Sequence, residues 1–178
     1  DYTRSSNPTR QVLEDNLAAI DNGQYAVSFA SGMSAVDSCF KLLTAGDHIV
    51  CGDDVYGGVT RLLDNVTVQQ GIDVSYVDTT NADAVRNVIT PKTRMLWIET
   101  PTNPLLKVSD LEEMVKIARQ NDILLGVDST FATPVFLRPL EFGADIVMHS
   151  TTKYLAGHNQ IIGGVIVTNH QHVFEKMK

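Results

Sequence analysis

The sequence predicts an α/β fold, with a mostly parallel sheet of about seven strands and helices on both of its faces. Two observations lead to this prediction. Short runs rich in β-branched and aromatic residues recur along the chain, and amphipathic stretches of helical period lie between several of them. Helices that alternate with strands connect parallel strands, and a parallel sheet is covered on both faces. No internal repeat interrupts the alternation, so one domain is expected over the 178 residues.

Seven runs are expected to be strands, because each is short, apolar and bounded by polar or turn-forming residues. They are residues 25–30, 48–53, 73–78, 94–99, 123–128, 145–150 and 163–169. Helical spacing of apolar residues appears in four stretches, 10–20, 33–43, 82–89 and 111–120. Thr9 is expected to cap the first helix and Asn22-Gly23 to end it. Ser109, with Glu112 three residues later, predicts a capping box for the last.

Composition excludes several classes of protein. A hydrophobic content of 43% and a charged content of 20% are those of a soluble globular domain. The net charge of −7 argues against nucleic acid or an anionic membrane surface as a partner. No apolar run reaches the ~20 residues that span a bilayer. Cys39 and Cys51 fit no metal-ligand spacing, so buried free thiols and a cytoplasmic location are expected.

The site is expected at one edge of the sheet. In open α/β sheets, ligands bind beyond the carboxyl ends of the strands. The candidate residues are therefore those that directly follow five of the predicted strands. They are residues 31–33, 54–58, 99–103, 128–131 and 149–153.

Two of these loops offer groups for an anion and a cation. After "FASGM" turns into a helix, the backbone N–H groups of Gly32 and Met33 are free to bind phosphate. An ordinary strand-to-helix turn would use the same residues. Asp128 ends an almost wholly apolar strand, where a carboxylate needs a cation or several donors. It either caps the following turn or holds a cationic ring nitrogen.

The stretch "HSTTKYLAGHN" places Lys153 after Ser150, Thr151 and Thr152, at the end of the strand that follows Asp128. Hydroxyl groups suit a phosphate and an amine suits a carbonyl, although Ser and Thr also cap helices. One crossover connection, usually right-handed, would bring Asp128 and Lys153 to the same edge.

The remaining candidates are polar or aromatic residues that are weak signals by themselves. Tyr56, beside two glycines, can stack on a flat ligand or pack on its own domain. Asn103 lies in a loop that neighbouring prolines restrain. Tyr2 and Arg4 offer a phenol and a guanidinium suited to phosphate, although residues near a terminus are usually solvated. A phosphate cradle, a flat ring, a carboxylate and a lysine together match pyridoxal 5'-phosphate (PLP).

Six stretches resemble the cystathionine γ-lyase/γ-synthase family of PLP enzymes, which have the fold-type-I large domain. They are "YTRSSNPTR", "FASGM", "DDVYGG", "ETPTNP", "VDSTFATP" and "HSTTKYLAGHN". The resemblance implies that Lys153 is the Schiff-base lysine and that Asp128 pairs with the pyridine nitrogen. It implies that Tyr56 stacks on the ring and acts as acid or base on the leaving group, with Asn103 and Thr130 along the polar edge of the ring.

The resemblance also implies how the phosphate is held and how subunits associate. The phosphate ligands within one subunit would be Gly32, Met33, Ser150 and Thr152. Tyr2 and Arg4 would reach the phosphate of a neighbouring subunit, which implies a homodimer, and family members are commonly homotetramers. The expected partner besides a second copy is a small amino-acid substrate.

The implied activity is γ-elimination or γ-replacement on sulfur amino acids, lyase-like or synthase-like. Arg61 matches a position where such members carry an arginine near the distal end of the substrate, although a solvated helix charge is equally expected there. Methionine γ-lyase and O-acylhomoserine sulfhydrylase are the alternatives within the family. Gly58 stands where methionine γ-lyases usually have a cysteine, which disfavours the first of them.

Two alternative functions lie outside this activity. By the resemblance, residues 1–178 form the PLP-binding large domain, while the family's amino-terminal arm and carboxyl-terminal substrate domain lie outside them. A truncated, non-catalytic cofactor-binding or dimerisation module is therefore an alternative. A nucleotide-dependent dehydrogenase is disfavoured, since no G-x-G-x-x-G turn follows an early strand.

Overall fold

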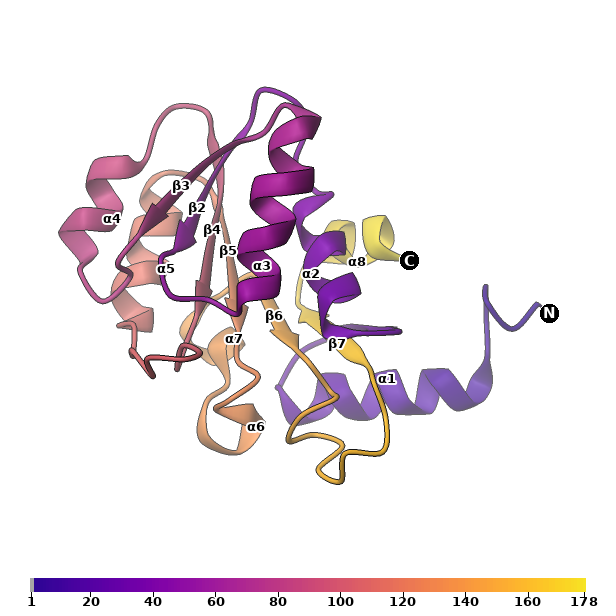
Figure 1. The fold of residues 1–178 in the computed structure, drawn as a ribbon. Helices are drawn as coiled ribbons and strands as arrows, with labels where there is room; N and C mark the ends of the chain where they lie inside the picture. Colours follow the sequence, from indigo (N-terminus) through magenta and orange to yellow (C-terminus); the bar gives the residue numbers. More distant parts are fainter. Residues whose placement is uncertain (1) are drawn as a thin grey trace.

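Seven strands form one sheet in the order β1-β7-β6-β5-β4-β2-β3 (Figure 1). The computed structural model describes residues 2–178. The strands are β1 (Tyr25–Phe29), β2 (His48–Gly52), β3 (Asp73–Val77), β4 (Thr93–Glu99), β5 (Leu124–Asp128), β6 (Ile146–His149) and β7 (Gly164–Thr168). β7 is antiparallel to β1 and β6, and the β2–β3, β2–β4, β4–β5 and β5–β6 pairs are parallel. All seven predicted strands are confirmed, each to within one residue at either end.

The helices cover both faces, as predicted. They are α1 (Pro8–Ile20), α2 (Gly32–Phe40), α3 (Gly57–Leu62), α4 (Ala82–Val88), α5 (Leu111–Gln120), α6 (Thr133–Phe136), α7 (Pro139–Phe142) and α8 (Gln171–Met177). The four predicted helices are present as α1, α2, α4 and α5, and α8 lies in the stretch "HQHVFEKMK", where a further helix was expected to start. α3, α6 and α7 were not predicted. After α3 the chain continues through a π-helical turn (Leu63–Thr67) and a 3₁₀ turn (Val68–Gln70). None of the helices within residues 2–178 has the length and apolarity needed to cross a bilayer.

The predicted N-terminal cap of α1 is wrong, whereas its predicted C-terminal end is confirmed. The cap is Asn7, whose side-chain oxygen accepts the backbone N–H of Arg10 at 3.1 Å, and Thr9 lies inside the first turn. A proline in the first turn, at Pro8, allows this earlier start, since its missing N–H is not needed there. Asn22 follows the helix with a positive φ of 57°, which ends it as predicted.

The predicted capping box of α5 is also wrong. The cap is Asp110, whose carboxylate accepts the backbone N–H of Glu113 at 3.1 Å. The hydroxyl of Ser109 pairs instead with that of Thr79 at 2.7 Å. Asp is as good a cap as Ser, and the tertiary contact to Thr79 leaves Ser109 outside the helix.

Two layers of helices enclose the sheet. On one face α2, α3 and α8 cover a cluster centred on Trp97, whose ring meets Phe40 edge-on at 5.2 Å. Gly126 makes room for Trp97, because a Cβ there would lie 2.6 Å from the indole ring. α4 and α5 cover the other face at one end of the sheet, and α1 and α7 cover it at the other end. Cys39 and Cys51 are free and buried in the first cluster, as predicted, and burial raises the pKa of both thiols.

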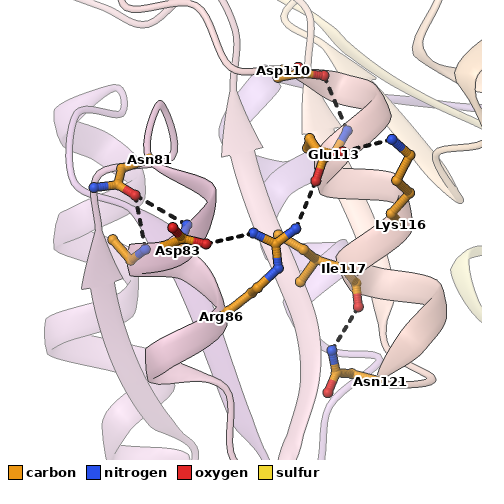
Figure 2. Close-up of polar contacts among 9 residues, drawn as sticks. Asn81, Asp83, Arg86, Asp110, Glu113, Lys116, Ile117 and Asn121 are labelled. Atoms are coloured by element: carbon orange, nitrogen blue, oxygen red, sulfur yellow. Dashed lines mark hydrogen bonds and ion pairs between the residues drawn. The ribbon is translucent and has the colours of Figure 1, made fainter.

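A chain of ion pairs joins α4 to α5 on the surface (Figure 2). The guanidinium of Arg86 contacts Asp83 at 2.9 Å within α4 and Glu113 at 2.7 Å on α5. Lys116 contacts the second oxygen of Glu113 at 2.7 Å. Exposed pairs of this kind each contribute little to stability, so the buried clusters rather than these charges hold the helices in place.

Candidate active site

A cavity of about 230 Å³ lies at the carboxyl ends of the parallel strands. All five predicted loops contribute to it, which confirms that they meet at one edge of the sheet. The predicted site residues that line it are Gly32, Met33, Tyr56, Asn103, Asp128, Thr130, Ser150, Thr152 and Lys153. Tyr2, Arg4 and Arg61 are not among the lining residues.

Asp128 is a buried carboxyl at the end of β5, with 5% of its surface exposed. Its Oδ1 accepts the backbone N–H of Thr130 at 3.0 Å and the Thr130 hydroxyl at 2.6 Å. Burial raises the pKa of Asp128, whereas these two hydrogen bonds and the nearby His149 lower it. The turn is therefore capped by one carboxylate oxygen, and the same side chain still lines the cavity, where a cation would favour its charged form.

The start of α2 forms a narrow cradle against the turn after β6. Ser31 caps the helix and accepts the backbone N–H of Ser34 at 3.0 Å. The N–H groups of Gly32 and Met33, in the first turn, have no acceptor within the helix. A Cβ on Gly32 would lie 2.7 Å from Cβ of Ser150 and 2.8 Å from its Oγ. Only glycine allows these two segments to approach so closely.

The turn that carries Lys153 does not begin a helix. The backbone N–H of Lys153 donates to the carbonyl of Ser150 at 3.1 Å, which closes a turn directly after β6. The hydroxyl of Thr152 accepts the N–H of Gly163 at 3.0 Å and donates to its carbonyl at 3.1 Å. Thr152 thus ties the turn to the start of β7, and its hydroxyl proton is already used within the protein. Lys153 forms no ion pair within residues 2–178.

Tyr56 precedes α3 and lies beside the cradle. Its side chain is 46% exposed, and the residue lines the cavity. A Cβ on Gly58 would lie 2.5 Å from Cε1 of Tyr56 and 2.8 Å from Sδ of Met33. The absence of a side chain at Gly58 therefore leaves the space that the Tyr56 ring occupies.

Glu99 is a lining residue to which the sequence reasoning assigned no role. It ends β4 and pairs in register with Asp128 at the end of β5. Its Oε2 accepts the backbone N–H of Tyr56 at 2.7 Å. Burial raises the pKa of Glu99 to about 8, the charge of Asp128 raises it as well, and hydrogen bonds from the backbone N–H groups of Tyr56 and Asn103 lower it. The sequence signal was the same as for Asp128, an acidic residue that ends an apolar strand.

The family model described as Cys/Met metabolism PLP-dependent enzyme matches residues 1–178. The chain belongs to this family. It is 46% identical over 178 residues to a probable cystathionine gamma-synthase of Herpetosiphon aurantiacus, covering all of this chain and 56% of that protein. It is 48% identical over 180 residues to a cystathionine beta-lyase of Coxiella burnetii, covering all of this chain and 46% of that protein.

A solved structure agrees with this assignment. The cystathionine gamma-lyase from Lactobacillus plantarum, complexed with L-serine, matches with a TM-score of 0.98 and 44% identity over 99% of this chain and 46% of that one. The chain therefore spans about half the length of the relatives it matches. The predicted family, the fold-type-I α/β architecture and the PLP cofactor of the family are confirmed.

The cavity of this family member has groups suited to each part of PLP. The cradle at Gly32 and Met33 offers backbone donors for a phosphate, and the hydroxyl of Ser150 lies directly beside it. The buried carboxyl of Asp128 suits a cationic ring nitrogen, and the amine of Lys153 suits an aldehyde. The Thr152 hydroxyl fits less directly, because binding a phosphate would compete with its contact to Gly163.

Three predicted residues lie outside the cavity. Tyr2 and Arg4 precede α1 near the amino terminus, and the Arg4 guanidinium lies 5.3 Å from the centre of the Tyr2 ring. Their predicted reach to a neighbouring subunit stays a prediction. Arg61 lies in the last turn of α3, next to Gly57, with its Nη1 3.4 Å from where a Cβ of Gly57 would be.

Proposed function

We propose that these residues hold PLP and that the protein performs γ-elimination or γ-replacement on a sulfur amino acid, as a cystathionine γ-lyase-like or γ-synthase-like enzyme. The observation that carries the proposal is the meeting of Asp128 and Lys153 at one cavity, from the ends of the neighbouring strands β5 and β6. Residues 1–178 would supply the cofactor-binding part of the site.

When bound, PLP supplies an electron sink that makes the Cα–H of an amino-acid substrate acidic. Asp128 would favour the protonated form of the ring nitrogen, and the hydroxyl of Thr130 holds the Asp128 carboxylate in place. Lys153 would hold the cofactor through its amine. The same amine, close to the Cα proton of a bound substrate, would remove and return that proton as base and acid. Tyr56 would cover the cofactor ring and would give a proton to the leaving group or take one from it.

The phosphate would be held by the N–H groups of Gly32 and Met33 and by Ser150, with Thr152 after its hydroxyl turns from Gly163. Tyr2 and Arg4 would complete the phosphate site of a neighbouring copy. The proposed assembly is therefore at least a homodimer, and a homotetramer if two such dimers associate.

The choice of reaction within the family depends on residues around Tyr56. Arg61, on α3 directly after the Tyr56 loop, would face the distal carboxylate of a substrate such as cystathionine. A methionine γ-lyase-like site is disfavoured, since Gly58 stands two residues after Tyr56, where such enzymes usually carry a cysteine. O-acylhomoserine sulfhydrylase activity and a purely cofactor-binding or dimerisation role are the alternatives. The experiment below separates the second of them from catalysis.

Covalent trapping tests the proposal. The chain is incubated with PLP, reduced with borohydride, digested, and mapped by mass spectrometry. We expect a yellow protein before reduction and a label on Lys153 afterwards, with none in Lys153→Ala. A label on another residue, or no label, would refute the cofactor site. Release of a 2-oxo acid from cystathionine then separates catalysis from cofactor binding alone.

A further inference from the structure

Two loops at the cavity are linked by carboxyl groups, one from each side. Glu99, at the end of β4, accepts the backbone N–H of Tyr56 at 2.7 Å in the loop after β2. In return, Asp54 from the loop after β2 accepts the hydroxyl of Thr102 and the backbone N–H of Leu105, the latter at 3.1 Å, in the loop after β4. Each loop therefore supplies the acceptor for the other.

The loop after β4 is also closed on itself. The hydroxyl of Thr102 accepts the backbone N–H of Lys107 at 2.8 Å, and the N–H of Thr102 donates to the Lys107 carbonyl at 3.0 Å. The amine of Lys107 lies 2.9 Å from Asp53, next to Asp54. Asn103 lies inside this closed loop, so a force that moves Asp54 moves Asn103 as well.

The two carboxyl groups that link the loops are buried, with 6% of Glu99 and 9% of Asp54 exposed. Water therefore competes little for their hydrogen bonds, which strengthens each of them. Glu99 is costly where it stands, because it is buried beside Asp128, the next carboxyl in register. Burial raises the pKa of Glu99 to about 8. The end of a strand does not require a buried acid. The contact that Glu99 makes with the Tyr56 loop is what offsets the cost of burying it.

We propose that Glu99 and Asp54 are positioning residues that hold the Tyr56 loop and the Asn103 loop together, and so fix the Tyr56 ring and the Asn103 side chain relative to Asp128. The inference rests on the proposed function, because it assigns the positioned groups to the PLP site. Neither carboxylate touches the reacting atoms. They act through Tyr56 and Asn103.

Hydrogen exchange of the full-length protein without PLP tests the contacts themselves. In Glu99→Ala the amide of Tyr56 loses its acceptor, so we expect peptides that contain Tyr56 and Asn103 to exchange at least about tenfold faster. Glu99→Gln keeps an acceptor oxygen and is expected to exchange within about threefold of wild type. Unchanged exchange in Glu99→Ala, or equal acceleration in both variants, would overturn the proposal.

Glu14 provides a matched control. It is also buried, at 9% exposed, and it also accepts a backbone N–H from a neighbouring element, that of Ser28 at 2.9 Å. It lies on α1 and does not line the cavity. Glu14→Ala is expected to lower global stability without changing exchange at Tyr56 and Asn103. If it accelerates those amides as much as Glu99→Ala, the effect is general loosening and the proposal fails.

PLP binding tests the consequence. We expect the Kd for PLP to rise about tenfold in Glu99→Ala and in Asp54→Ala, to stay within about threefold in Glu99→Gln, and to be unchanged in Glu14→Ala. The visible circular dichroism of the bound chromophore should weaken in the two alanine variants that bind. If Glu99→Ala does not fold, Asp54→Ala and Glu99→Gln carry the test. Wild-type affinity in Asp54→Ala would overturn the proposal.

The outcomes separate the two proposals. A wild-type protein that carries no borohydride label on Lys153 refutes the PLP site, while exchange at Tyr56 and Asn103 still decides whether the loops are held by Glu99. A labelled Lys153 together with unchanged exchange and affinity in Glu99→Ala and Asp54→Ala keeps the cofactor site and refutes the positioning role.

Discussion

The hydroxyl of Thr130 donates a hydrogen bond of 2.6 Å to Oδ1 of Asp128. Because its proton is used in that bond, the same oxygen acts as an acceptor for the backbone N–H of Ser150, at 2.8 Å. One side chain therefore links the carboxyl that ends β5 to the turn after β6 that carries Lys153. Together with the pairing of β5 and β6, this contact fixes the carboxyl of Asp128 relative to the turn that carries Lys153.

Replacing Thr130 with valine keeps the shape of the side chain and removes both contacts. We expect PLP affinity to fall about tenfold, as measured by titration of the apoprotein. The physical reason is the pKa of Asp128, which burial already raises and which the Thr130 hydroxyl lowers. Without that hydroxyl the carboxyl is neutral over a wider pH range and holds a cation less well. Thr130→Ser retains the donor, so an equal loss in both variants would contradict this role.

Asp128→Asn separates attachment from proton transfer. The amide fills the same space, so Lys153 should still be labelled after borohydride reduction. An asparagine cannot hold the ring nitrogen's proton by charge, and we expect exchange of the substrate Cα proton to slow by at least about 10²-fold. Exchange into deuterated water, followed by NMR in the full-length protein, measures this. Exchange at the wild-type rate would remove Asp128 from its assigned role.

Gly32→Ala should damage the phosphate cradle. The new Cβ would lie 2.7 Å from Cβ of Ser150, which forces α2 and the turn after β6 apart. We expect a loss of about 1–3 kcal/mol in the free energy of unfolding and a weaker PLP affinity. Gly52→Ala is the control, since its Cβ would make ordinary contacts of 3.4 Å to Val55 and 3.5 Å to Thr79. Urea denaturation and PLP titration of both variants check the prediction.

The strands and the edge that carries the site could be predicted, because a period of apolar runs and the carboxyl-end rule are local signals. Asp128 and Lys153 were placed at one cavity on that basis. The caps predicted at Thr9 and Ser109 were wrong because an Asn or Asp within two residues can cap equally well, and tertiary packing decides between such neighbours. α3 was missed since it begins with two glycines, Gly57 and Gly58, which are typical of a loop.

Contacts between distant segments left no sequence signal. The bond between Thr152 and Gly163 depends on how the turn after β6 meets β7, so the phosphate role expected for Thr152 did not include this competition. The contacts that Glu99 and Asp54 make between the two loops likewise depend on the pairing of β2 with β4. Glu99 did carry a local signal, because it is an acid at the end of an apolar strand. The reasoning that identified Asp128 would have identified Glu99 as well.

The pH dependence of stability should report on Glu99. Its pKa lies at about 8 in the folded protein, because burial and Asp128 disfavour the charged form, against an ordinary value of 4.5. Between these values the folded state binds more protons than the unfolded state. The contribution of Glu99 to the free energy of unfolding is therefore fully present below about pH 4.5 and is lost as the pH rises toward about 8. The slope from one such group is at most about 1.4 kcal/mol per pH unit.

Glu99→Gln removes this titration while keeping an acceptor for the backbone N–H of Tyr56. We expect the free energy of unfolding of the apoprotein, from urea denaturation across that pH window, to fall less steeply in Glu99→Gln than in wild type. The two curves should converge at the acidic end, where Glu99 is neutral in both states of the wild-type protein. Parallel curves would mean that Glu99 is ionised throughout, and the Asp128–Glu99 pair would then carry two negative charges in the folded protein.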